Sequence, residues 1–130
     1  MSFEAEILQD FLTEAGELVE RLESDLVALE ADPTDPEMLN QVFRALHTVK
    51  GSASFLALGE LVKIAHAAES ALNAARNRVV TIDRAAMDLL LQTVDIIKTQ
   101  LGQIRAGAAL AVAPDRLVAA LSALGEGKAL

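Results

Sequence analysis

The 130-residue sequence contains no cysteine, which excludes disulfide frameworks, thiolate zinc sites and cysteine nucleophiles. It has no tryptophan or tyrosine and only four phenylalanines, so nucleic-acid bases would find few side chains on which to stack. Basic residues are outnumbered, since 11 Lys and Arg face 19 Asp and Glu. The resulting net charge of −8 would repel a phosphate backbone, and we expect no nucleic acid as a partner.

Long apolar runs are also missing. The longest uncharged, mostly apolar stretch near the end, residues 106–114, is far too short to span a bilayer. The acidic first ten residues lack the basic flank and apolar run of a signal peptide. The sequence therefore predicts no membrane insertion and a cytoplasmic location.

Proline is scarce, with three residues, and 52% of the chain is apolar, much of it Ala and Leu, which favours helices. The length suits one domain with a single core. Apolar positions recur at three- and four-residue steps in five segments. They predict helices over about 3–31, 36–56, 60–77, 84–106 and 114–124, with 125–130 as the start of a linker or tail. Because the connections are short, we expect an all-α fold, an up-and-down antiparallel four-helix bundle with a short fifth C-terminal helix.

The first of the two histidines, His47, begins the string HTVKGS in the second predicted helix. A rotation of about 100° per residue puts it roughly 120° from the centre of the apolar stripe, on the flank of the helix. Lys50 and Gly51 lie one turn further on and border the imidazole. A mid-helix glycine costs about 1 kcal/mol relative to alanine. A bare surface that another protein must approach would explain Gly51, and Lys50 could hold a dianionic phosphate.

The third predicted helix carries His66 and Glu69 at i and i+3, on one face. Its many alanines make it thin, so it could pack close to the second helix and bring this pair near His47. A carboxylate that accepts a hydrogen bond from one ring nitrogen fixes the tautomer and leaves a lone pair on the other. Glu69 could thus make His47 a better nucleophile, as the aspartate does in the Ser-His-Asp triad.

The string from His47 through Lys50-Gly51, with the downstream His66-x-x-Glu69, resembles the signature of histidine phosphotransfer (HPt) domains. The closer similarity is to the amino-terminal domain of CheA-type chemotaxis histidine kinases, because of the FLTEAGELVERLESDL opening and the Asp-Pro-rich loop. The resemblance implies that His47 is phosphorylated on Nε2. It also implies that Glu69 orients His47, that Lys50 stabilises the phosphate and that His66 adds supporting hydrogen bonds.

The same resemblance implies the partners. The domain would be a substrate and not an enzyme by itself, within a CheA-like kinase of a two-component chemotaxis system. It would bind no cofactor and no metal, because the kinase catalytic domain and a CheY-like or CheB-like response-regulator receiver would supply ATP and Mg²⁺. The isolated domain is expected to be a monomer.

Three alternatives remain open. The chain could be a free-standing HPt shuttle between two receivers. It could be a metal-binding bundle, although it has a single His-x-x-Glu, in the reverse of the di-iron order, and Lys50 would repel a cation. It could be a structural dimerisation bundle, although that role would not predict Lys50-Gly51 beside His47.

Overall fold

The computed structural model describes residues 2–128 and confirms the expected all-α fold, with no strand in that range. Each helix begins and ends within one residue of the range expected from the apolar pattern. The helices are α1 (Phe3–Ala31), α2 (Pro36–Phe55), α3 (Gly59–Arg76), α4 (Arg84–Ala106) and α5 (Asp115–Gly125). None of the helices so described is long and apolar enough to cross a membrane.

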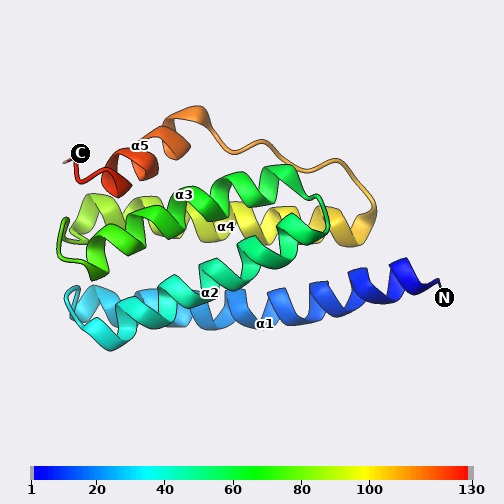
Figure 1. Ribbon diagram of the computed structural model, residues 1–130, viewed down its shortest axis with the longest axis horizontal. Helices are drawn as coiled ribbons and strands as arrows, with labels where there is room; N and C mark the ends of the chain where they lie inside the picture. Colours follow the sequence, from blue (N-terminus) through cyan, green and yellow to red (C-terminus); the bar gives the residue numbers. More distant parts are fainter. Residues whose placement is uncertain (1, 129–130) are drawn as a thin grey trace.

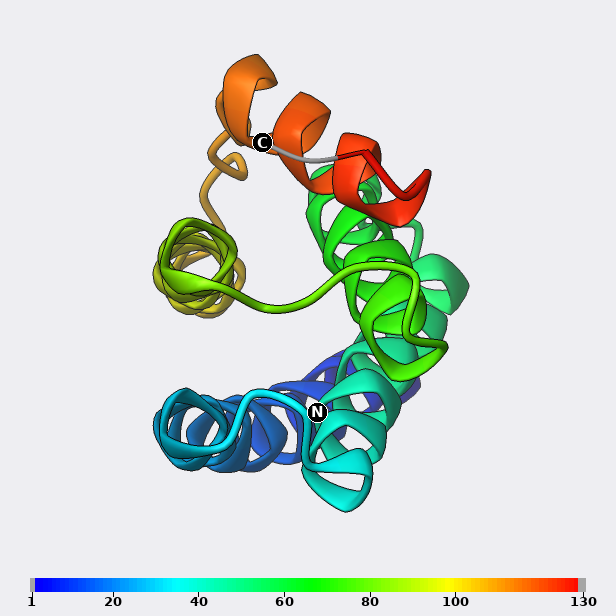
Figure 2. The same cartoon turned by 90° about the vertical axis from the view of Figure 1, so that its left-hand side faces the viewer.

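The first four helices form the bundle (Figure 1). Each packs against two neighbours, α1 against α2 and α4, and α3 against the same two helices, as the end-on view shows (Figure 2). The core between them is aliphatic and includes the fully buried Leu22, Leu46, Ile64 and Ile97. Because α2 and α3 are direct neighbours, side chains on their facing flanks can meet at the surface of the bundle.

Capping residues define where the helix that carries His47 begins. The Asp35 side chain accepts hydrogen bonds from the backbone N–H groups of Glu37 and Met38, at 3.0 and 3.3 Å. Pro36 follows at the first helical position, where its missing N–H costs nothing. Asp83 caps α4 in the same way, through a 2.9 Å bond from the N–H of Ala86. These caps fix the start of each helix and thereby its register in the bundle.

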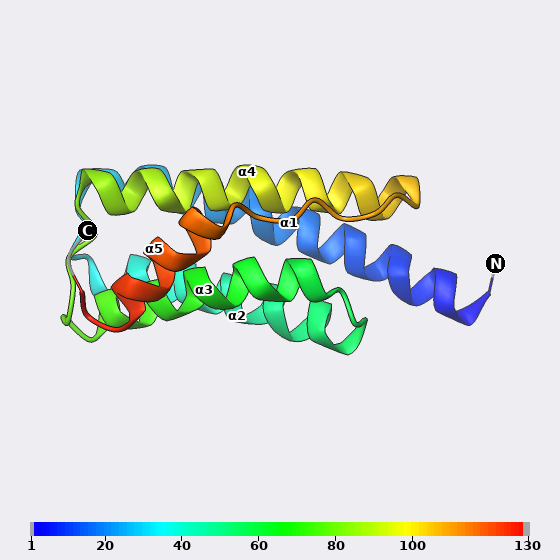
Figure 3. The ribbon, with the colours of Figure 1, turned by 90° about the horizontal axis from the view of Figure 1, so that it is seen from above.

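The fifth helix lies outside the bundle, across α3 and α4 (Figure 3). Its Leu117, Leu121 and Leu124 are buried. Gly125 allows the close approach, because a Cβ there would lie 2.8 Å from the Cβ of Ser70 on α3. Of the tail expected at 125–130, residues 129 and 130 lie outside the described part, and its role as a linker stays a prediction.

Candidate functional site

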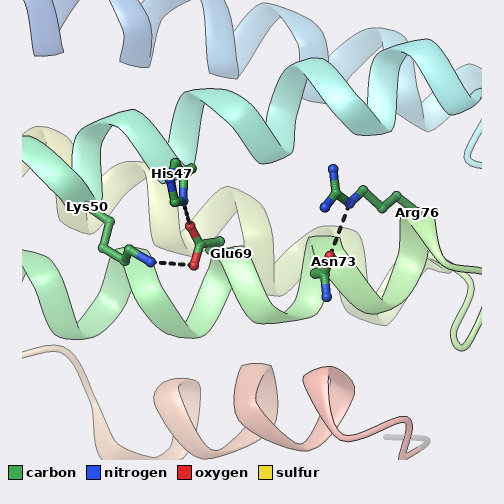
Figure 4. A network of polar contacts seen from close by, with 5 residues as sticks. All are labelled: His47, Lys50, Glu69, Asn73 and Arg76. Atoms are coloured by element: carbon green, nitrogen blue, oxygen red, sulfur yellow. Dashed lines mark hydrogen bonds and ion pairs between the residues drawn. The ribbon is translucent and has the colours of Figure 1, made fainter.

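The second helix presents His47 near its middle, on the flank that faces α3 (Figure 4). The side chain of His47 is 63% exposed, as expected for a position off the apolar stripe. Leu46 and Val49, on either side in sequence, are buried and hold the helix against the core. The imidazole is therefore presented by a rigid element while remaining open to a partner protein.

Glu69 of α3 reaches across to His47, with its Oε2 2.5 Å from the Nδ1 of the imidazole. The other carboxylate oxygen, Oε1, accepts a hydrogen bond of 2.7 Å from the Nζ of Lys50 (Figure 4). The Glu69 side chain is 11% exposed and that of Lys50 24% exposed. The structure thus joins three of the four side chains expected from the sequence, His47, Lys50 and Glu69, into one contiguous cluster.

The carboxylate of Glu69 is held in its ionised form. Burial alone would raise the pKa of Glu69, but the hydrogen bonds from Lys50 and His47, together with their charges, outweigh it and lower that pKa below 4.5. An ionised carboxylate can only accept hydrogen bonds. Nδ1 of His47 must therefore be the donor, and in the neutral ring the lone pair lies on Nε2.

Gly51 lies one turn beyond His47 and leaves open space on the helix. A Cβ at this position would find no atom within 4 Å. No steric demand from the described part of the chain accounts for the glycine. The geometry agrees with a surface kept bare for another molecule, which is the role suggested by its place beside the histidine.

His66 does not join the cluster. Its side chain is exposed, and no hydrogen bond to it occurs within residues 2–128. Within the same range no group of three or more His, Asp or Glu side chains could hold a metal ion.

Two contacts of His47 and its surroundings were not identified from the sequence. The imidazole stacks on Phe43, one turn earlier in α2, with ring centroids 6.0 Å apart and an interplanar angle of 17°. The guanidinium of Arg76, at the end of α3, lies 3.8 Å from the centroid of the same phenyl ring. The available signal in the sequence was spacing, because residues four apart lie on the same face of a helix. Phe43 and His47 are so spaced, and so are Glu69 and Asn73. Asn73 is the residue that accepts a hydrogen bond from Arg76.

The Hpt domain family model matches residues 6–107 of this chain. The sensor histidine kinase CheAY of Helicobacter pylori (strain ATCC 700392 / 26695) is 47% identical over 100 residues, which cover 77% of this chain. Those residues are 12% of that protein, so the chain spans about an eighth of its length.

Two solved structures share the fold. The CheA phosphotransferase domain from Thermotoga maritima has a TM-score of 0.76 and 34% identity, over 81% of this chain and 99% of that one. A solution structure of a CheA histidine phosphotransfer domain has a TM-score of 0.83 and 30% identity, over 96% of this chain and 92% of that one. These likenesses support a phosphotransfer domain over a metal-binding or purely structural bundle.

Proposed function

Because the chain belongs to the Hpt domain family and is a phosphotransfer domain of the CheA type, we propose that His47 is its phospho-acceptor. In this proposal His47 takes the γ-phosphoryl group of ATP bound to a histidine kinase catalytic domain. It then passes that group to an aspartate of a response-regulator receiver. The observation that carries the proposal is an exposed imidazole whose Nδ1 is bonded to an ionised, largely buried carboxylate.

Loading uses the lone pair on Nε2. As the Nε2–P bond forms, the bond between the γ-phosphorus and the bridging oxygen breaks and ADP leaves. The ring gains positive charge in this step, and the ionised Glu69 stabilises it through the proton that stays on Nδ1. Unloading reverses the bonding: a carboxylate oxygen of the receiver attacks the phosphorus and the electron pair of the N–P bond returns to Nε2. The domain ends unchanged, as a carrier must.

Lys50 is proposed to stabilise the phosphoryl group. Its ammonium has three N–H donors, and the bond to Glu69 uses one of them. Its other two donors have no side-chain partner within residues 2–128 and can donate to phosphoryl oxygens on the neighbouring imidazole. The side chain of His66 is exposed and makes no hydrogen bond within residues 2–128, so we propose no supporting hydrogen bond from it to the cluster. We expect His66→Gln to slow loading less than Glu69→Gln.

We further propose that the domain binds neither nucleotide nor metal. Transfer between phosphoryl donors and acceptors depends on positioning and on metal-assisted neutralisation of charge. The chain has no Walker-type glycine loop to hold a triphosphate. ATP and Mg²⁺ would come with the kinase in the loading step, and Mg²⁺ with a CheY-like or CheB-like receiver in the unloading step. We place this exchange in the cytoplasm, with the domain as a monomer.

The test follows labelled phosphate through three additions. The purified domain is incubated with labelled ATP and Mg²⁺, then with a CheA-type kinase core that lacks its own Hpt domain, then with a CheY-like receiver. We expect acid-labile label only after the kinase is added and loss of that label to the receiver. His47→Gln should take up none, whereas the matched control His66→Gln should still be labelled. Label on His47→Gln at the wild-type rate would exclude His47 as the acceptor.

A further inference from the structure

The ring of His47 is held by more than its hydrogen bond. Phe43 lies one turn earlier on the same flank of α2, and its ring is nearly parallel to the imidazole, at 17°. The centroid separation of 6.0 Å lies within the range of favourable offset aromatic pairs. Phe43 is half-buried, whereas the side chain of His47 is 63% exposed. The phenyl ring is therefore the more fixed partner of the two.

Phe43 is in turn covered by Arg76 of α3, whose guanidinium carbon lies 3.8 Å from the phenyl centroid, well inside cation–π range. The guanidinium is anchored at two points. Its Nε donates to Oδ1 of Asn73 on α3 at 3.0 Å, and its Nη1 donates to Oδ1 of Asn40 on α2 at 3.1 Å. Arg76 thus bridges both helices, and Figure 4 shows it beside Asn73, farther along the α2–α3 pair than the His47 cluster.

A single hydrogen bond does not fix an exposed imidazole. The bond from Nδ1 to Glu69 holds one atom of the ring and sets the tautomer, but it leaves the ring free to swing about that atom. Nε2 lies across the ring from this pivot, so a swing moves the atom that must attack the phosphorus. A parallel aromatic surface restricts this motion without occupying Nε2. Glu69 and Phe43 therefore constrain different degrees of freedom of His47.

We propose that Phe43 and Arg76 are positioning residues for His47. Arg76, held by Asn40 and Asn73, fixes the phenyl ring of Phe43, and the phenyl ring fixes the plane of the imidazole. The effect on phosphotransfer rests on the proposed function, whereas the effect on the ring of His47 does not. Misplacement of a reacting atom by about 1 Å can cost up to about 100-fold in rate, so a loss of this support is measurable.

The first arm of the test needs no phosphate. In the ¹³C,¹⁵N-labelled domain, NMR relaxation at Cε1–H of His47 reports the order of the ring, and the ¹⁵N shifts report its tautomer. Phe43→Leu and Arg76→Gln should lower the order parameter while the Nδ1–H tautomer persists. Phe43→Tyr keeps the ring and should behave as the wild type. Arg76→Lys keeps the positive charge but loses the planar guanidinium that donates to the side-chain amides of Asn40 and Asn73. Its order parameter should lie between those of Arg76→Gln and the wild type.

The second arm measures loading by a CheA-type kinase core. Phe43→Leu should lower kcat by about 10-fold with KM unchanged, because the acceptor atom is misplaced and the docking surface is not. Arg105→Gln, an exposed arginine in the last turn of α4, is the matched control and should change neither. A ring order unchanged in Phe43→Leu and Arg76→Gln would overturn the proposal, as would a lowered order with full kcat. If the wild type is never phosphorylated, the proposed function fails, and the NMR arm alone still decides whether the stack holds the ring.

Discussion

Among the individual residues, Glu69 couples the geometry of the site to its ionisation. Among the residues that the structure describes, it is the one carboxylate that contacts both His47 and Lys50, and its side chain is largely buried. Two cationic or proton-donating neighbours compensate for the cost of burying a charge, which is why the pKa of Glu69 is lowered despite the burial. The same contacts that orient His47 therefore make a pH-dependent contribution to folding.

We predict that Glu69→Gln destabilises the domain at neutral pH by about 1.5–3 kcal/mol, the usual net value of a hydrogen bond to a charged group. The folded-state pKa of Glu69 lies below its ordinary 4.5. Its contribution should hold at all pH values above that number and disappear as the pH falls through the lowered pKa. Urea unfolding should show that the difference in free energy of unfolding between the wild type and Glu69→Gln is constant above pH 5. That difference should decrease below about pH 4.5. A gap that stays constant down to pH 3 would contradict this linkage.

His47, Lys50 and Glu69 could be identified as candidates from the sequence. Their spacing places His47 and Lys50 on the flank of one predicted helix and Glu69 on the next helix. The sequence did not identify Phe43 and Arg76, because a phenylalanine beside an apolar stripe and an arginine at a helix end look ordinary until the register of α2 against α3 is known. His66 shows the limit of face arguments. Positions i and i+3 are about 60° apart around a helix, enough for Glu69 to face α2 while His66 points to solvent.

Among the helices, Gly51, which lies four residues before the end of α2, allows a matched comparison. Gly51 and Gly102 are both exposed and helical, and a Cβ at either position meets nothing within 4 Å. Each alanine variant should therefore stabilise the domain, by up to about 1 kcal/mol. Only Gly51→Ala, one turn from His47, should slow phosphorylation by the kinase. Thermal unfolding and initial loading rates test both claims, and equal loading rates would show that the bare surface at Gly51 is not needed for access.

Gly125 has the opposite environment. A Cβ there would lie 2.8 Å from the Cβ of Ser70 and 3.2 Å from its backbone carbonyl carbon, so α5 must move away from α3. We predict that Gly125→Ala destabilises the domain by about 1–3 kcal/mol, the usual cost of overpacking. Ser70→Gly in the same chain removes the closest atom and should recover part of the loss. Denaturation midpoints of the single and double variants measure this, and additive losses would refute direct contact between the two positions.

The ranges of α2 and α4 were predictable because local chemistry marks the start of each and the end of α4. Asp35-Pro36 begins α2, Asp83 begins α4, and Gly107 adopts a left-handed conformation after α4. The packing of α5 was not predictable in the same way. The apolar stripe of α5 indicates that one face of this helix is buried, but it does not indicate which helix covers that face. The α5 helix packs against α3, where Gly125 meets Ser70. Ala67 and Ala74 lie three and four residues from Ser70, on the same face by helical spacing, and are buried. Short side chains of this kind carry little directional signal.

For the molecule as a whole, the net charge of −8 is unevenly distributed. The sequence of α1 carries nine acidic residues against one arginine. The sequences of α2 and α3 together carry three acidic and four basic residues, as well as both histidines. The face that presents His47 is thus much less negative than the opposite side of the bundle. Such an asymmetry can orient an acidic partner toward the histidine during encounter.

Charge reversal at Arg44 tests this steering. Arg44 is exposed and lies one turn before His47, whereas Arg105 is exposed in the last turn of α4. Arg44→Glu and Arg105→Glu carry the same net charge, so they differ only in where the negative charge is placed. A receiver that binds Mg²⁺ through carboxylates would be repelled by the first variant. We predict that Arg44→Glu lowers kcat/KM for transfer to a CheY-like receiver, chiefly through KM, and that Arg105→Glu does so much less.

Ionic strength separates electrostatic steering from a lost contact. The screening length shortens from about 10 Å at 0.1 M salt to about 3 Å at 1 M. The difference in kcat/KM between Arg44→Glu and the wild type should therefore decrease as salt is added. Stopped-flow measurement of transfer from the phosphorylated domain, from 0.05 to 0.5 M salt, gives this dependence for all three proteins. A gap that persists at high salt would mean that Arg44 makes a direct contact with the receiver. Equal losses in Arg44→Glu and Arg105→Glu would mean that net charge alone, and not its placement beside His47, governs the encounter.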